Sequence, residues 1–412
     1  MIKKLLFVLL IPIFGFGQNP NYSEDIAPII YGKCLQCHYD GGIAPLTLET
    51  YASVVYNAGM VQNVTSTGEM PPWPADTLFQ NYANENILSM NEINTIMDWI
   101  TNGVPIGDTS LLPPMPIFGN SSQLGVPDLE LQMPTYASTA TSNSDDYVCF
   151  SIPTGLLQNR RIKAIEVIPG NLQTVHHVLV SVDPLPNSFI VTTADCMGPQ
   201  GDMLYSYAPG ALPLTYPENT NNSFGVVLPA NSSVSFAMHY PEGSLGQLDS
   251  TKVRFYFYPQ TTVIREISYD FLINEGLFGG PFYLPPNQIT EITGSFGPTN
   301  QDYSFMSVFP HMHLLGKDMV IYAVTPLNDT IKLIKINKWD FEWQYSYFFE
   351  KFIKIPAGSI IYAKGNYDNT VSPSNPIPVT VQSGFNTQDE MFIGGFQYLP
   401  YQLGDENISI DN

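Results

Sequence analysis

The sequence predicts a multidomain protein in which a small all-α domain precedes two all-β sandwich domains. Three observations lead to this expectation: a helical apolar pattern before residue 108, a Pro-, Gly- and Ser-rich stretch at 109–126, and short β-type runs from residue 127 onward. A chain of 412 residues has room for two or three domains. Its 16 Lys and Arg against 37 Asp and Glu give a formal charge of −21, which argues against nucleic acid as a partner.

The first residues predict an export signal. Lys3 and Lys4 precede an apolar run from Leu5 to Phe16, which is typical of a signal peptide at residues 1–17. This run is short for a membrane span, and no other stretch is long and apolar enough, so no stable membrane anchor is expected. We therefore expect a periplasmic or secreted protein, in a compartment where disulfides persist.

Residues 18–108 read as a small helical domain. Ile93, Ile96, Met97 and Ile100 recur at the spacing that gives a helix one apolar face, and Gly103 follows as a helix-ending residue. The stretch 109–126 is then expected to be a linker.

From residue 127 the pattern becomes that of an antiparallel β-sandwich. Short runs rich in Val, Ile, Phe and Tyr, such as "RIKAIEVIPG" and "KVRFYFYPQ", alternate with clusters of Pro, Gly, Asn and Ser. The length allows two sandwiches, which we expect at 127–260 and 261–408.

The pentapeptide "CLQCH" at residues 34–38 predicts covalent haem attachment. Its spacing lets Cys34 and Cys37 both add to one porphyrin while His38 ligates the iron from the same turn. The alternative is a redox Cys-x-x-Cys motif on a thioredoxin-like βαβ unit, but the flanking sequence lacks that pattern. We expect one haem c.

A sixth iron ligand is expected from Met70, in the Pro-flanked stretch "GEMPPWPAD". Small c-type cytochromes present an axial methionine on a similar loop, so the segment from about 20 to 108 resembles a monohaem cytochrome c domain. The alternative for Met70 is core packing, since it is one of 14 methionines.

The chain's other five histidines form two groups in the sequence. His311 and His313 are separated by one residue, so in a strand their side chains point to the same face and can bind one metal ion. His176 and His177 are adjacent, and a regular strand would direct them to opposite faces; with a distorted backbone they could share a metal that His239 completes. Imidazole suits copper, zinc, iron and nickel, so the histidines alone do not name the metal.

Four segments, "HHVLVSVD", "FAMHYPEG", "FPHMHLLGK" and "TQDEMFIGGFQY", carry a resemblance to a known family. Their order and approximate spacing resemble the copper type II, ascorbate-dependent monooxygenases over residues 127–402. The resemblance implies two jelly-roll domains and two copper ions. It assigns an electron-transfer copper to His176, His177 and His239, and an oxygen-activating copper to His311, His313 and Met391.

Two further segments extend the resemblance. "DDYVCF" and "TTADCMGPQGDM" are similar to the family segments that carry one of its disulfides, which implies a bridge between Cys149 and Cys196. Taken singly, Met391 could be a core methionine and the adjacent histidines could be polar residues at a strand end; the matches in order favour the ligand assignment.

The family that the sequence resembles includes peptidylglycine α-hydroxylating monooxygenase and dopamine β-monooxygenase, and the sequence departs from it at positions where the peptidylglycine enzyme holds its substrate. Arginine, asparagine and tyrosine there are replaced here by Phe309, Ile393 and Gly395. A peptide carboxylate would find no bidentate partner at these positions, so we expect a different substrate and a roomier, less polar pocket.

Together these patterns predict an exported haem- and copper-containing monooxygenase. It would hydroxylate an aliphatic C–H bond of a small organic substrate with O2, taking electrons through the haem domain and from a possible external donor. The alternatives are a non-catalytic electron-transfer or copper-binding protein, and sandwich domains that only recognise a ligand or partner.

Overall fold

The computed structural model describes residues 19–116, 122–142, 144–185, 189–191, 196, 201–273, 282–384 and 386–410. The predicted signal peptide at 1–17 lies outside these residues. The fold is β-rich, with 39% strand and 13% helix. The chain divides into two compact units, and each is described by itself: the first is Met1–Leu35, Thr47–Pro71 and Leu88–Pro116, and the second is Gln36–Leu46, Pro72–Ile87 and Ile117–Asn412.

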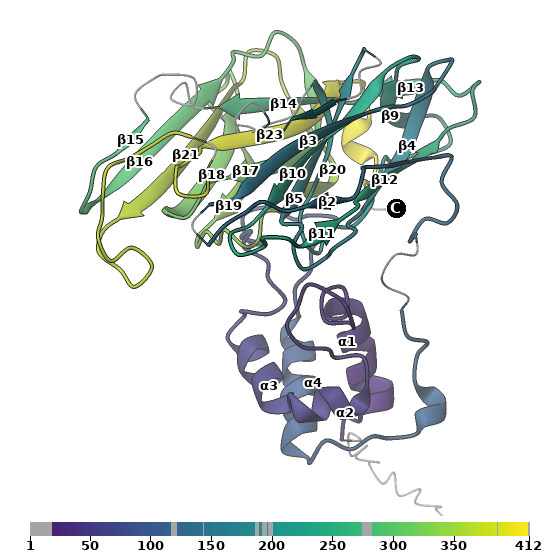
Figure 1. Ribbon diagram of the computed structural model, residues 1–412, viewed down its shortest axis with the longest axis vertical. Helices are drawn as coiled ribbons and strands as arrows, with labels where there is room; N and C mark the ends of the chain where they lie inside the picture. Colours follow the sequence, from purple (N-terminus) through teal and green to yellow (C-terminus); the bar gives the residue numbers. More distant parts are fainter. Residues whose placement is uncertain are drawn as a thin grey trace, which may run out of the picture. The chain divides into compact units, whose positions relative to one another are not determined.

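The prediction of a small all-α cytochrome c domain is wrong. Across the described residues the structure has four short α-helices, α1 (Ala27–Lys33), α2 (Tyr51–Tyr56), α3 (Ala58–Ser66) and α4 (Met90–Thr101), in a chain that is mostly β (Figure 1). A short π-helix, η1 (Tyr22–Ile26), leads directly into α1, and a 3₁₀ turn, η2 (Thr109–Leu111), follows α4. Residues 36–46 and 72–87, which the helical pattern had included, belong to the β-rich unit.

Helix α4 is the element that the apolar spacing predicts. Ser89 and Glu92 form a capping box at its start, which satisfies backbone N–H groups that have no partner within the helix. The helix buries Ile96 together with Trp99, whose indole N–H donates to the Pro105 carbonyl at 3.0 Å. Trp99 lay outside the predicted apolar face because that pattern counted aliphatic residues and methionine.

The segment 72–87 adds to the β-rich unit through backbone pairing. Ala75 bridges to Ile336, and Tyr82 bridges to Phe349 and donates its hydroxyl to the Leu333 carbonyl at 2.9 Å. Prolines at 71, 72 and 74 exclude a long helix here, because proline lacks the N–H that a helix interior needs.

Two sheets form the first β-region, and nearly all their neighbouring strands are antiparallel. The six-stranded sheet runs, in order, β1 (Leu129–Gln132), β12 (Lys252–Phe257), β4 (Arg160–Ile168), β9 (Ser223–Leu228) and β13 (Ile264–Glu266), with β8 (Leu214–Thr215) also beside β4. The five-stranded sheet runs β6 (Phe189–Val191), β3 (Asp146–Pro153), β10 (Ser233–Tyr240), β5 (His177–Asp183) and β7 (Asp202–Tyr207). A short pair joins β11 (Leu248–Asp249) to β2 (Tyr136–Ala137).

Two four-stranded antiparallel sheets form the second β-region. One runs β14 (Ser268–Ile273), β23 (Ile393–Pro400), β17 (Tyr303–His311) and β20 (Tyr347–Ile355). The other runs β16 (Gln288–Phe296), β21 (Ile360–Asn369), β18 (Gly316–Val324) and β19 (Thr330–Ile336). A short pair joins β15 (Tyr283–Leu284) to β22 (Val381–Gln382), and the 3₁₀ turn η5 (Asp405–Asn407) follows β23.

Residue patterns explain these strands. In β12, Val253, Phe255 and Phe257 alternate with more exposed residues, which gives the strand one buried face. Strand β10 is buried along its whole length, as expected for a central strand between β3 and β5. The prediction of a β-rich chain after residue 127 is confirmed.

The predicted disulfide is also confirmed. Cys149 of β3 is bonded to Cys196, with their Cα atoms 5.5 Å apart, and both residues are buried. The bridge closes a segment that includes His176 and His177, and it ties this segment to the middle of the five-stranded sheet.

Within the described parts of the chain, no helix has the length and apolar character needed to cross a bilayer.

Candidate functional site

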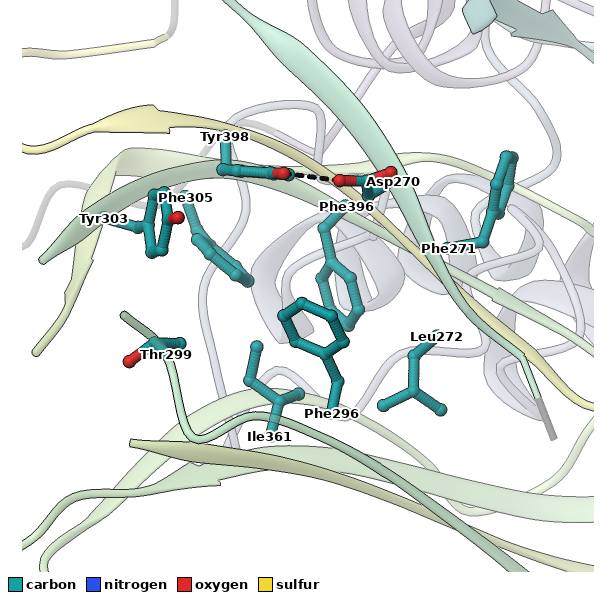
Figure 2. A pocket seen from close by; sticks show the side chains of 10 residues that line it. All are labelled: Asp270, Phe271, Leu272, Phe296, Thr299, Tyr303, Phe305, Ile361, Phe396 and Tyr398. Atoms are coloured by element: carbon teal, nitrogen blue, oxygen red, sulfur yellow. Dashed lines mark hydrogen bonds between the residues drawn. The ribbon is translucent and has the colours of Figure 1, made fainter. Parts of the chain in front are cut away.

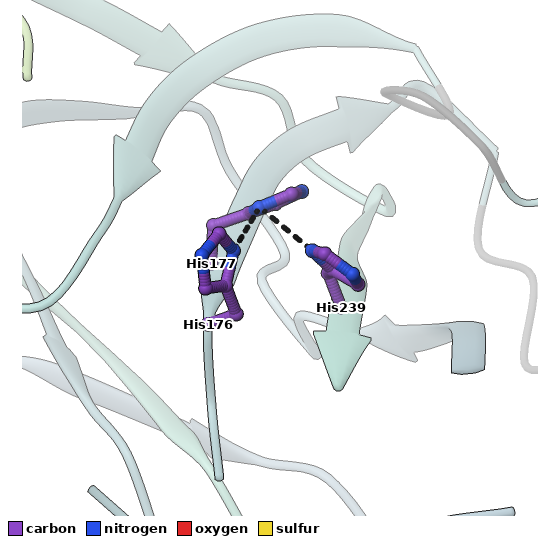
Figure 3. A group of neighbouring side chains, drawn as sticks. All are labelled: His176, His177 and His239. Atoms are coloured by element: carbon purple, nitrogen blue, oxygen red, sulfur yellow. Dashed lines mark hydrogen bonds between the residues drawn. The ribbon is translucent and has the colours of Figure 1, made fainter. Parts of the chain in front are cut away.

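Three histidine side chains meet on the five-stranded sheet. His177 begins β5, and the register of β10 sets His239 directly opposite it. The ligand atoms of these two residues and His176 all lie within 4.8 Å of one another (Figure 3). The closest approaches join the Nδ1 atom of His177 to those of His176, at 3.3 Å, and His239, at 3.2 Å.

The position of His176 explains how two adjacent histidines share one site. His176 precedes β5, and its backbone N–H donates to the carbonyl of His239 at 3.0 Å instead of continuing the strand ladder. The alternation of a regular strand therefore does not apply to this pair, and both rings reach the same side.

Burial keeps His176 and His177 neutral. It lowers the pKa of His176 to about 3, with a further contribution from His239, and it lowers the pKa of His177 well below its ordinary value. Neutral imidazole is the form that binds a metal ion, and three converging nitrogens have few other ways to satisfy their lone pairs. The donor set therefore fits copper or another metal that accepts imidazole.

The outer side of His239 is held by two residues at the start of β3. The Tyr147 ring stacks on the imidazole, with centroids 4.4 Å apart and planes 4° apart. The Oδ2 atom of Asp145 lies 3.4 Å from His239 Nε2, which has no hydrogen-bond partner among the described residues. Burial alone would raise the pKa of Asp145, but His239 and the Thr387 hydroxyl favour its charged form and hold that pKa at about 2.

A second histidine pair lies at the end of β17. The rings of His311 and His313 have centroids 5.1 Å apart. Each ring has its Nδ1 atom at an oxygen acceptor: Gln344 Oε1 at 2.6 Å from His311, and the Asp389 carbonyl at 3.0 Å from His313. These contacts require Nδ1–H on both rings and leave both Nε2 atoms as the available ligands.

Met391 lies in the turn that contacts this pair. The carboxylate of the preceding residue, Glu390, accepts the backbone N–H groups of His313 at 2.9 Å and Leu315 at 2.5 Å. Burial raises the pKa of Glu390 to about 8. Met391 itself is buried, and its carbonyl accepts the hydroxyl of Tyr367. Strand β17 and the Met391 turn are thereby joined at the second pair.

A cavity of about 400 Å³ lies beside the three-histidine group. His176 and His239 line it from one β-region, while Leu314 and Phe341 line it from the other. The Phe341 ring contacts both groups, with centroids 5.4 Å from His176 and 5.7 Å from His313. Three carboxylate residues, Asp145, Glu242 and Glu342, also line the cavity, and no lysine or arginine does so in the described parts of the chain.

The three departures from the monooxygenase pattern lie on paired strands. Phe309 of β17 pairs with Gly395 of β23, and His311 pairs with Ile393. A Cβ atom added at Gly395 would lie 2.8 Å from the hydroxyl oxygen of Tyr269. The space at Gly395 is therefore taken by Tyr269, so the structure gives no roomier pocket at this position.

The residues predicted to hold haem are divided between the two compact units. Cys34 follows α1 in the first unit, whereas Cys37 and His38 belong to the second, and neither cysteine forms a disulfide. The Nδ1 atom of His38 lies 3.0 Å from the Leu46 carbonyl, which leaves Nε2 available as a ligand. Burial raises the pKa of the Cys37 thiol to about 11. Met70 is partly buried after α3, and its N–H donates to the Val64 carbonyl at 3.0 Å.

A separate apolar cavity lies between the sheets of the second β-region (Figure 2). It measures about 120 Å³ and is lined mainly by aromatic side chains, among them Phe305 and Phe396. The carboxylate of Asp270, which lines it, accepts the hydroxyl of Tyr398. Among the described residues that line it there is no histidine, cysteine or methionine, and none of the candidate metal ligands is included.

Sequence reasoning missed the residues that support the ligands. Gln344 carries no motif, and its contact with His311 joins residues 33 positions apart in the chain. Asp145, Tyr147 and Glu390 stood inside the quoted segments "DDYVCF" and "TQDEMFIGGFQY", so their place in segments that resemble the family was a usable signal.

Comparison with known proteins adds one assignment. Residues 281–406 match the family described as copper type II ascorbate-dependent monooxygenase, C-terminal domain. The matched segment contains His311, His313 and Met391, and the family binds copper. This part of the chain is therefore copper monooxygenase-like. No curated protein sequence matches the chain.

Several solved structures align with the chain at low similarity. The major capsid protein P2 from bacteriophage PM2 is 12% identical, with 67% of this chain and 100% of that chain covered and a TM-score of 0.30. A structure of infectious bursal disease virus, Gx strain, is 10% identical, with 68% of this chain and 72% of that chain covered and a TM-score of 0.17. Scores this low carry no argument about fold or function.

The contacts of Glu390 predict a stability effect. Replacing Glu390 with alanine should leave the N–H groups of His313 and Leu315 without acceptors, at a cost on the order of 3 kcal/mol in the free energy of unfolding. Glu390→Gln is the matched control, because it keeps one acceptor and should lose less. Urea unfolding measures both variants, and an unchanged midpoint for Glu390→Ala would contradict the role assigned to this carboxylate.

Proposed function

We propose that this chain is an exported copper monooxygenase. It inserts one atom of dioxygen into an aliphatic C–H bond of a small organic substrate and reduces the other atom to water with two electrons and two protons. The observation that carries the proposal is the convergence of the Nδ1 atoms of His176, His177 and His239, together with a second histidine pair in the segment that matches a copper monooxygenase domain.

Two sets of residues are the proposed ligands of two copper ions with different roles. His176, His177 and His239 would hold one copper through Nδ1, and His311, His313 and Met391 would hold the other through Nε2 and the thioether. Copper held by a thioether favours the reduced state that meets dioxygen, and copper held by three imidazoles can relay one electron. The chain's own part is to fix the tautomers: Gln344 and the Asp389 carbonyl keep Nδ1–H on the second pair, and Tyr147 orients His239.

The cavity beside the first group is the proposed substrate site. Phe341 and Trp343 supply apolar walls, and Asp145, Glu242 and Glu342 supply negative potential. Carboxylate substrates would be repelled, because no lysine or arginine is among the residues that line the described cavity. Neutral or cationic molecules fit this lining better than a peptide carboxylate does.

Covalent haem at Cys34, Cys37 and His38 is the second part of the proposal. Two observations support it: neither thiol is used in a disulfide, and the Leu46 carbonyl orients His38 with Nε2 available. Haem bound there, with Met70 as the proposed sixth ligand, would supply single electrons to the three-histidine group. A possible external donor would then reduce the haem.

Export is proposed from the chain's first residues and its disulfide. The basic and apolar start is typical of a signal peptide, and a structural disulfide such as Cys149–Cys196 is typical of proteins in an oxidising environment. The proposed location is therefore periplasmic or secreted.

Metal content tests the two ligand sets. Copper-loaded protein should contain two copper ions per chain by elemental analysis, and His176→Ala and His311→Ala should each lose a different one. His38→Ala is the matched control, because it changes a histidine outside both groups and should keep both coppers. Loss of the same single ion from the first two variants would contradict the two-site proposal.

Haem attachment predicts a covalent adduct. Mass spectrometry of protein expressed with a haem-attachment system should find the porphyrin on Cys34 and Cys37, and Cys37→Ala should weaken or abolish attachment. Met70→Ala should keep the haem but lower its reduction potential, because thioether ligation favours ferrous iron. An optical spectrum and potential unchanged by Met70→Ala would remove Met70 as the ligand.

Oxygen incorporation separates the monooxygenase from its main alternative, a non-catalytic electron-transfer or copper-binding protein. Reduced, copper-loaded protein supplied with isotopically labelled dioxygen and a mixture of small neutral and cationic metabolites should yield a labelled hydroxylated product. Met391→Leu should lose product formation while copper at the three-histidine group remains. Copper-loaded wild-type protein that exchanges electrons but consumes no dioxygen would favour the alternative.

A further inference from the structure

Asp145 occupies an unusual position between the two candidate metal groups. Its side chain is only 7% exposed, and its Oδ2 atom lies 3.4 Å from Nε2 of His239. The same Oδ2 atom accepts the backbone N–H of Thr387 at 3.4 Å and the Thr387 hydroxyl, while Oδ1 accepts the N–H of Glu242 at 3.0 Å. One carboxylate thus contacts both a ligand candidate of the first group and a loop of the second β-region.

The loop that Asp145 contacts leads directly to the second group. Its turn is closed at Asn386, whose backbone N–H and side-chain amide both donate to the Asp389 carboxylate, at 3.2 and 2.9 Å. The carbonyl of the same Asp389 accepts from Nδ1 of His313, and Glu390 accepts the N–H of His313. Asp145 is therefore linked to His313 by hydrogen bonds at Thr387 and at the Asp389 carbonyl, and two residues of backbone join these two points.

No lysine or arginine neutralises Asp145 in the described parts of the chain, although such a partner is the usual solution for a buried carboxylate. Its charge is instead held by the hydrogen bonds from Thr387 and Glu242 and by the His239 ring. Neither role alone accounts for both contacts of Asp145. A link between the two β-regions does not require contact with the His239 imidazole, and orientation of His239 does not require contact with Thr387.

We propose that Asp145 is a positioning residue that couples the two histidine groups through Thr387. This inference rests on the proposed metal binding at those groups. When Nδ1 of His239 is a metal ligand, its Nε2–H becomes a stronger donor, and the contact with Asp145 shortens into a charge-assisted hydrogen bond. Asp145 then holds Thr387 in place, and the loop presents the Asp389 carbonyl and Met391 to the second group.

The coupling is reciprocal, because a free energy that links two binding sites acts equally in both directions. Filling the second group should therefore tighten metal binding at the first. This consequence distinguishes coupling from a purely structural contact, which would change stability without linking the two groups.

Methyl NMR of Met391 tests the link without using activity. In the His311→Ala/His313→Ala variant only the first group can bind metal, and zinc serves as a diamagnetic stand-in for copper. The Met391 ε-methyl resonance, assigned by its loss in a further Met391→Leu change, should shift when one equivalent of zinc is added. Adding Thr387→Val should abolish the shift and leave zinc affinity at the first group unchanged within a few-fold.

Two more variants test whether the Met391 shift depends on Asp145 and is specific to this loop. Asp145→Asn keeps the side-chain size and should lose the Met391 shift while weakening zinc binding by about 10- to 100-fold, the usual effect of removing a carboxylate behind a ligating histidine. Thr370→Val is the matched control, because Thr370 donates its hydroxyl to the Asp368 carboxylate at 2.6 Å outside both groups, and it should keep the shift.

The outcomes are distinguishable. Zinc binding with an unmoved Met391 resonance, or an equal shift in the Thr387→Val background, would overturn the coupling and leave the proposed function standing. Failure of the first group to bind zinc or copper in any background would overturn the proposed metal binding and this inference with it.

Discussion

The pairing of β10 with β5 is the constraint on which the candidate site depends. Its register sets His239 opposite His177, and the N–H of His176 completes the arrangement by donating to the His239 carbonyl. A shift of one residue would turn His239 to the other face of the sheet. The disulfide at Cys149 stabilises this register from the neighbouring strand, because β3 pairs with β10 along its length.

Burial makes the histidine nitrogens available as metal ligands. Burial lowers the pKa values of four histidines, so their nitrogens are available as ligands and not as protonated cations; these are His176, His177, His311 and His313. Backbone and amide oxygens fix the tautomers of His311 and His313, whereas the three-histidine group uses the opposite ring nitrogen. The two groups therefore differ in which ring atom they present as well as in the thioether proposed for one of them.

The sequence allowed several of these features to be predicted, for reasons that are local. The spacing of His311 and His313 predicted that the two rings lie close together, and they do, with centroids 5.1 Å apart, although β17 ends at His311. Helix α4 follows from its apolar spacing. The pairing of Cys149 with Cys196 came from a resemblance to a known family, and the structure has that bond.

The features that could not be predicted depend on contacts between distant segments. Thr387 and Asp145 are 242 positions apart, and no local pattern signals their hydrogen bond. The assignment of residues 72–87 to a helical domain was wrong because nothing nearby in sequence reveals the bridge from Tyr82 to Phe349. Similarly, Gly395 suggested open space, since its sequence position gives no sign that Tyr269 packs against it.

The central claim is that two distinct histidine groups hold copper with different ligand atoms. Anomalous diffraction at the copper absorption edge, from crystals of the copper-loaded protein, tests it most directly. The account predicts two peaks, one among the Nδ1 atoms of His176, His177 and His239, and one bounded by Nε2 of His311 and His313 and by the Met391 sulfur. A single peak, or copper found away from both groups, would contradict it.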